Sequence, residues 1–140
     1  MPTPPPSDVL LNKAAIIERC IRRIGEEYAA APQLESPTHT DALVLNIERA
    51  CQAAIDMAMH LVSQKHLGIP QNSSEAFDLL NKAGVIQPDL CGSLRAMTGF
   101  RNVAIHEYQE LDREILHYIA QEGFRDFVRL CLAVGLEIES

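Results

Sequence analysis

The sequence predicts an all-α fold, an up-and-down bundle of about five helices. Apolar residues recur at steps of three and four along several long segments, which is the helical period. Most of these segments begin near a capping residue or a proline and end near a glycine or a proline. Runs that alternate apolar and polar residues, as half-buried strands do, find little support, and no hairpin turn joins two of them.

The length of 140 residues leaves room for a single core, so we expect one helical domain over residues 8–140. Residues 1–7 hold four prolines and are expected to form a flexible start. The composition is 47% hydrophobic and 22% charged, which is typical of a packed fold and not of a disordered chain.

Two long helices are expected first. Ser7 is placed to cap a helix that runs to about Ala30, and its apolar stripe is Leu10, Ala14, Ile17, Ile21, Ile24 and Tyr28. Residues 31–40 contain two prolines and predict a loop. The second helix is then predicted over residues 41–67 and closed by Gly68, with a stripe of Leu43, Ile47, Ala50, Ala54, Met57, Ala58 and Leu61.

A short third helix is predicted by a capping box. Asn72 is followed three residues later by Glu75, so each side chain is placed to bond the other residue's backbone N–H. The helix is expected to end at Gly84.

Two further helical segments complete the bundle. Pro88 suits the first turn of a fourth helix that we expect to reach about Tyr108. Asp112 is a candidate cap for a fifth element that runs to Leu136, with a break near Gly123.

The net charge of −7 counts against a nucleic-acid partner, because phosphate contacts usually come with a basic patch. It does not exclude a nuclease, which needs positive charge only at its cleft. The four cysteines form no C-x-x-C pair that would suggest zinc binding or redox exchange, and they are predicted to be buried, reduced thiols. We expect no metal and no other cofactor. Neither a membrane span nor a signal peptide is recognisable, and the expected location is the cytoplasm.

Arg101 stands out in the fourth helix. At about 100° per residue it projects into the middle of an apolar stripe. A guanidinium keeps its charge, so this position requires either an internal carboxylate or a cleft that admits an anion. Six residues of this stripe fall within roughly 60° of it: Leu90, Leu94, Met97, Ala104, Ile105 and Tyr108.

A polar edge lies beside this arginine. Asn102 and His106 are four residues apart on one flank, and Arg95 falls between them in projection. Arg101 and His106 are five residues apart, so they converge on one ligand only if the arginine reaches sideways or the helix loosens near its end.

These groups suit cleavage of RNA by its own 2′-hydroxyl, which needs no metal. His106 would transfer the proton, and Arg101 would stabilise the charge that develops on the phosphate. Asn102 would orient the phosphate or the imidazole. The alternative is structural: Arg101 would pair with a glutamate of another helix, for example Glu48, and His106 would be an ordinary polar residue. Spacing leaves both interpretations open.

Asp56 and His60 are four residues apart on one helical face, but two ligands make a weak metal site. We expect them to bond to each other or to a neighbouring helix. If they line the cleft, Asp56 would pair with Arg101 or His106 as a supporting group, and Arg95 is a second candidate for that role.

Residues 101–108, which read RNVAIHEY, resemble the R-X4-H motif of the HEPN ribonucleases, and the trailing His-X-Tyr resembles the HepT toxins. Three further segments are similar to that family: Glu48–Ala50, Ile55–His60 and Met97–Phe100. The resemblance spans roughly residues 43–119 and shows no departure at the motif positions.

This resemblance implies a HEPN-like bundle that forms a homodimer, with two motifs facing one another across a cleft. It implies an RNA substrate, not DNA, and catalysis by Arg101 and His106 with support from Asn102. It also implies a partner, a small nucleotidyltransferase antitoxin that silences the toxin by adenylylating Tyr108. The toxin and the antitoxin are expected to form a complex, for which the sequence predicts no stoichiometry. The rival interpretations are a non-catalytic HEPN-like module that binds a nucleotide or the transferase, and a helical adaptor.

Overall fold

The computed structural model describes residues 7–139, and the proline-rich start at residues 1–6 lies outside them. Six α-helices and no strand occur in this range, which confirms the all-α prediction. A single 3-10 turn (Tyr108–Glu110) and a π-turn (Ile119–Gly123) interrupt the second half. The helices are α1 (Asp8–Ala30), α2 (Pro37–Gln64), α3 (Ser73–Lys82), α4 (Pro88–His106), α5 (Arg113–Tyr118) and α6 (Arg125–Ala133).

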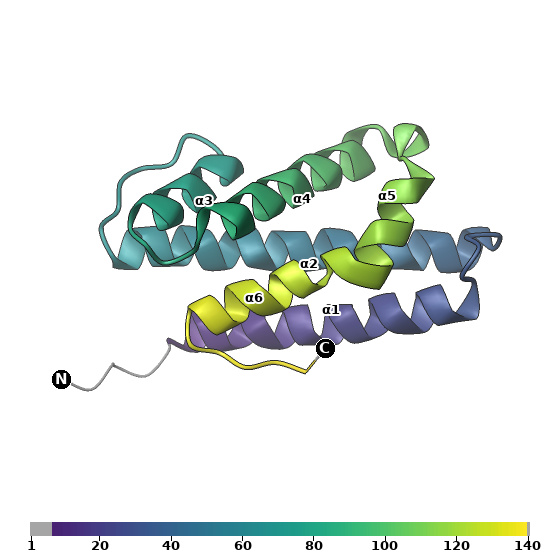
Figure 1. The fold of residues 1–140 in the computed structure, drawn as a ribbon, viewed down its shortest axis with the longest axis horizontal. Coiled ribbons are helices and arrows are strands. Elements are labelled where there is room, and N and C mark those ends of the chain that lie inside the picture. Colours follow the sequence, from purple (N-terminus) through teal and green to yellow (C-terminus); the bar gives the residue numbers. More distant parts are fainter. Residues whose placement is uncertain (1–6, 140) are drawn as a thin grey trace.

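Helix α2 is the central element of the bundle. Figure 1 shows α1 lying antiparallel along one side of α2, while α3 and α4 pack along the other. The segment after α4 turns back through α5, and α6 then packs against both α2 and α4. The up-and-down course of α1, α2, α4 and α6 therefore encloses one core, to which all six helices contribute buried side chains.

Most helix starts are capped as the sequence predicts. The side chain of Ser7 accepts a hydrogen bond from the Leu10 amide at the start of α1, and Asn72 and Asp112 cap α3 and α5 in the same manner. The predicted start of the second helix at Asp41 is wrong. Helix α2 begins at Pro37, because Ser36 acts as the cap and proline suits the first helical turn.

The helix ends depart more from the expectation. Helix α2 stops at Gln64 and α6 at Ala133, about one turn before the predicted positions. The break expected near Gly123 is confirmed as the π-turn between α5 and α6. A Cβ at Gly123 would meet Tyr118 Cε1 at 3.1 Å and Met97 Cε at 3.2 Å, so a larger residue here would require these two side chains to shift by a few tenths of an ångström.

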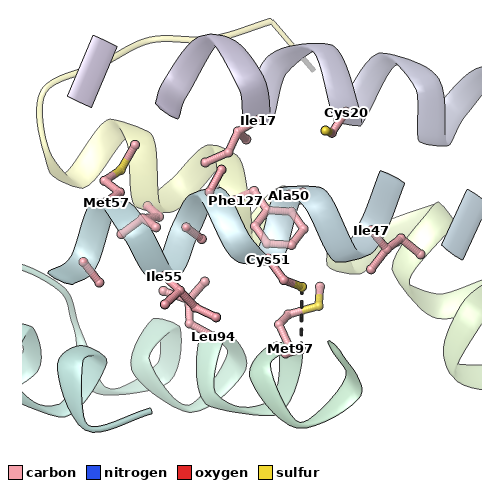
Figure 2. Close-up of a cluster of buried hydrophobic side chains, with 14 of the residues drawn as sticks. Ile17, Cys20, Ile47, Ala50, Cys51, Ile55, Met57, Leu94, Met97 and Phe127 are labelled. Atoms are coloured by element: carbon pink, nitrogen blue, oxygen red, sulfur yellow. Dashed lines mark hydrogen bonds between the residues drawn. The ribbon is translucent and has the colours of Figure 1, made fainter. Parts of the chain in front are cut away.

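Figure 2 shows the centre of the core, where the ring of Phe127 lies among side chains of α1 and α2. The four cysteines are buried and free, as the sequence predicts. Burial raises the pKa of the Cys51 thiol to about 12, and this thiol donates a hydrogen bond to the Met97 carbonyl oxygen at 3.6 Å. Such thiols remain protonated, so they pack as apolar groups.

Across residues 7–139, no helix combines the length and the apolar character that crossing a membrane requires.

Replacing Phe127 by alanine is expected to lower the free energy of unfolding by about 3–5 kcal/mol, because the ring is fully buried and its loss leaves a cavity. Urea denaturation measures this change. Leu132→Ala on the same helix is the matched control, because Leu132 is 51% exposed and its truncation should change stability by less than about 0.5 kcal/mol. Equal effects of the two substitutions would contradict the position of Phe127 in the core.

Candidate functional site at the end of α4

The candidate site lies where α4 ends. In Figure 1 the C-terminal half of α4 runs away from α2, while its first half packs close to it. Leu94 and Met97 are accordingly buried, whereas Arg101, one turn further on and on the same face, is only half-buried. The divergence of the two helices lets the guanidinium reach the surface from an apolar face.

Arg101 is not held by an ion pair. In the described part of the chain, its one hydrogen bond goes to Asn102 Oδ1 at 3.4 Å, and no carboxylate lies within ion-pair distance. Glu48, the partner that the structural alternative suggests, is nearby but does not make that contact. Burial raises the pKa of the Glu48 carboxyl, and the positive charge of Arg101 partly opposes this rise. The arginine therefore remains able to bind an anion.

The predicted extension of the fourth helix to Tyr108 is wrong, because α4 ends at His106. Glu107 adopts φ −141° and ψ 50°, which are not helical values, and the 3-10 turn follows. Ile105 and Tyr108 are 45% and 42% exposed, so neither belongs to a buried stripe. The turn sends the Tyr108 side chain toward the start of α2.

Asn102 and His106 are both exposed on the last turns of α4. Among residues 7–139, no hydrogen bond joins the His106 ring to Arg101 or to Asn102. One chain thus brings the three groups to the same helix end without directing them at one point, as the five-residue spacing predicts.

The phenol of Tyr108 donates a hydrogen bond to Asp41 Oδ1 on α2. Burial is the largest cause that raises the pKa of Tyr108 to about 12, and the Asp41 hydrogen bond adds to it. The negative charges of Asp41 and Glu48 act in the same direction. Asp41 and Glu48 are two turns apart on α2, and together they face the end of α4.

Arg95 lies on the α3 side of α4, where its guanidinium contacts Asp78 Oδ1 at 2.8 Å. Arg95 and Asn102 both line a pocket of about 530 Å³ that also includes the first turn of α3. Arg95 is therefore on the same side as Asn102 but is already neutralised by a carboxylate.

Asp56 contacts α1 and lies about four turns along α2 from Asp41. Its carboxylate pairs with Lys13 at 3.1 Å and accepts a hydrogen bond from Gln52 at 2.8 Å. His60 contacts Ser7 Oγ at 3.0 Å. Both residues face α1, so the structure does not bring Asp56 to Arg101 or His106.

Asp41 is a site residue that the sequence does not predict. In the sequence it marks only the expected start of the second helix, because its partner Tyr108 is 67 residues away. No local pattern signals such a pair. Within residues 7–139, no group of three or more His, Cys, Asp and Glu side chains is arranged to hold a metal ion.

Comparisons with known proteins identify similar sequences and folds. The family described as Ribonuclease HepT-like matches residues 12–134. The mRNA nuclease HepT of Shewanella oneidensis is 41% identical over 122 residues, which cover 86% of this chain and 92% of that protein.

Two solved structures have the same fold. One is a tri-AMPylated Shewanella oneidensis HEPN toxin in complex with MNT antitoxin, with 38% identity, a TM-score of 0.88 and coverage of 92% of this chain and 98% of that chain. The other is a toxin–antitoxin with AMP-PNP, with 37% identity, a TM-score of 0.87 and coverage of 91% and 98%.

Replacing Asp41 by asparagine is expected to lower the pKa of Tyr108 below 12, because it removes a negative charge beside the phenol. The value should stay above about 10, since burial, the larger cause, remains. Near-ultraviolet titration measures it cleanly in a Tyr28→Phe and Tyr118→Phe background, because the chain has three tyrosines and no tryptophan. An unchanged titration curve would contradict the Tyr108–Asp41 contact.

Proposed function

This chain belongs to the ribonuclease HepT-like family, and on that basis we propose that it is a metal-independent endoribonuclease, the toxin of a toxin–antitoxin pair. The observation that carries the catalytic part of the proposal is Arg101, a half-buried arginine without a carboxylate partner in the described chain. Such a group is suited to bind a phosphate whose negative charge grows during reaction. The acidic balance of the whole chain is compatible with this role, because the positive charge is local.

In the proposed reaction the 2′-hydroxyl of RNA attacks the adjacent phosphorus, and the 5′-oxygen of the next nucleotide leaves. His106 transfers the proton, because an imidazole can both accept and donate one. Arg101 binds the non-bridging oxygens, and Asn102 orients the phosphate. This chemistry requires no metal and no organic cofactor.

Two copies of the chain are proposed to form the working site. Arg101 and His106 project from one helix end in different directions, so a phosphate is best surrounded by groups from two helix ends. Ile105, which is 45% exposed beside them, is an apolar residue suited to a contact between copies. A homodimer with the motifs facing a shared cleft meets both requirements.

The proposed partner is a nucleotidyltransferase antitoxin, like the one in the complex with the tri-AMPylated toxin. Tyr108 is the proposed acceptor of AMP, because this residue is 42% exposed and follows His106 by two residues. A bulky, negatively charged nucleotide at this position would compete with RNA for Arg101. For a toxin of this kind, which acts on cellular RNA, the proposed location is the cytoplasm.

Expression of the wild-type chain alone is expected to stop growth, whereas the Arg101→Ala and His106→Ala variants should not. The purified wild-type chain should cleave RNA in the presence of a chelator, and each variant should lose about 10²-fold or more in rate. Gel assays of RNA cleavage and growth curves measure the two effects.

Arg125→Ala and His66→Asn are the matched controls, because both residues are exposed and lie away from the end of α4. Asparagine is chosen at position 66 because the backbone there has a φ of 55°, which asparagine tolerates. Full toxicity of His106→Ala would refute the catalytic role of this histidine. Retained binding of a nucleotide or of the transferase without RNA cleavage would instead identify a non-catalytic module.

Mixing the two inactive variants tests whether the site is shared. The two variants are unfolded and refolded together, so that about half of the dimers are mixed. If each phosphate is bound by Arg101 of one copy and His106 of the other, a mixed dimer holds one intact pair out of two. The mixture should then show about a quarter of wild-type activity. If both groups come from the same copy, the mixture should remain inactive. Cleavage rates before and after subunit exchange distinguish the two outcomes.

A further inference from the structure

We propose that Asp41 is the general base for adenylylation of Tyr108: its carboxylate positions the hydroxyl and takes the proton when the oxygen attacks the nucleotide. The inference rests on the proposed silencing of this chain at Tyr108. It assigns part of that reaction's catalytic machinery to the acceptor chain instead of to the transferase alone.

The contact itself is the first support. The Tyr108 hydroxyl donates a hydrogen bond to Asp41 Oδ1, although the two residues come from the turn after α4 and the second turn of α2. Because the O–H bond points at Asp41, the lone pairs of the phenolic oxygen point away from it. Asp41 is exposed and Tyr108 is 42% exposed, so the contact lies at the surface of the chain, on a side that a nucleotide can approach.

The ionisation of Tyr108 explains why a base is needed. With a pKa of about 12, only about one molecule in 10⁵ carries a phenolate at neutral pH. The carboxylates of Asp41 and Glu48 oppose ionisation before the reaction. The hydroxyl therefore reacts as the neutral group, and a neighbouring acceptor must take its proton as the new bond forms.

Asp41 is the group placed to do so. Within the described residues, it is the only side chain that hydrogen-bonds the Tyr108 hydroxyl. Glu48 influences the phenol through its charge without such a contact, and His106 makes none. General-base geometry requires hydrogen-bond reach, which only Asp41 meets here.

The co-reactant is a nucleoside triphosphate. The phenolic oxygen forms a bond to the α-phosphorus, and the bond from that phosphorus to the oxygen that bridges to the β-phosphate breaks. Pyrophosphate leaves with the electron pair of that bond, and the proton of Tyr108 moves to Asp41 Oδ1. The product is a phosphodiester of AMP with Tyr108, and no oxidant or reductant takes part.

The test compares rates of AMP transfer from labelled ATP by the antitoxin to the full chain, in a His106→Ala background that removes toxicity. Asp41→Asn keeps an oxygen that can accept the hydrogen bond but is a poor proton acceptor. We expect it to lower kcat by about 10²-fold or more, with KM for the acceptor chain changed by less than about threefold. Asp41→Glu should recover part of the rate, because it retains a carboxylate.

Glu110→Gln is the matched control, since it removes one negative charge from the same turn as Tyr108 without touching the phenol, and it should react at the wild-type rate. Tyr108→Phe should accept no AMP. Circular dichroism and co-purification with the antitoxin confirm that each variant folds and docks.

The outcomes separate the two proposals. Wild-type kcat for Asp41→Asn, with AMP still on Tyr108, would overturn the role of Asp41 and leave the proposed silencing intact. An increase in KM alone would also overturn it, because Asp41 would then serve docking. Absence of AMP from Tyr108 in the parent chain would overturn the proposed silencing and this inference together.

Discussion

The cost of burying a guanidinium governs the arrangement of this molecule. Arg101 lies on the face of α4 that packs against α2 one turn earlier, and an unpaired buried charge there would cost several kcal/mol. The structure avoids this cost because α4 diverges from α2 and ends soon afterwards, at His106. Because the two helices diverge, Arg101 is only half-buried and remains accessible to an anion.

Helix α2 links the core to the site. Its buried side chains contact α1, α3, α4 and α6, while Asp41 and Glu48 face the end of α4. Asp41 binds the Tyr108 hydroxyl, and Glu48 lies near both Arg101 and Tyr108. The proposed RNA cleavage and its proposed silencing thus use neighbouring groups. Adenylylation of Tyr108 would therefore affect phosphate binding at Arg101 through the charge and the bulk of the added nucleotide.

Much of the fold follows from local sequence. The caps at Ser7, Asn72 and Asp112 and the break near Gly123 were all predictable, because capping and helix breaking depend on side chains within a few residues. The helical period also placed Arg101 on the correct face of α4. The Ser36 cap is just as local, but the prolines on either side of it predict a loop, and α2 therefore begins one turn before the expected position.

Sequence alone therefore determined the all-α class, the stripes that form the core and the motif from Arg101 to Tyr108. The tertiary structure alone decided how far Arg101 is buried, that Asp56 faces α1, and that Tyr108 meets Asp41. The physical reason is distance along the chain. A helix periodicity reports which way a side chain points from its own axis, whereas the exposure and the partner of that side chain depend on how helices tens of residues apart diverge or pack.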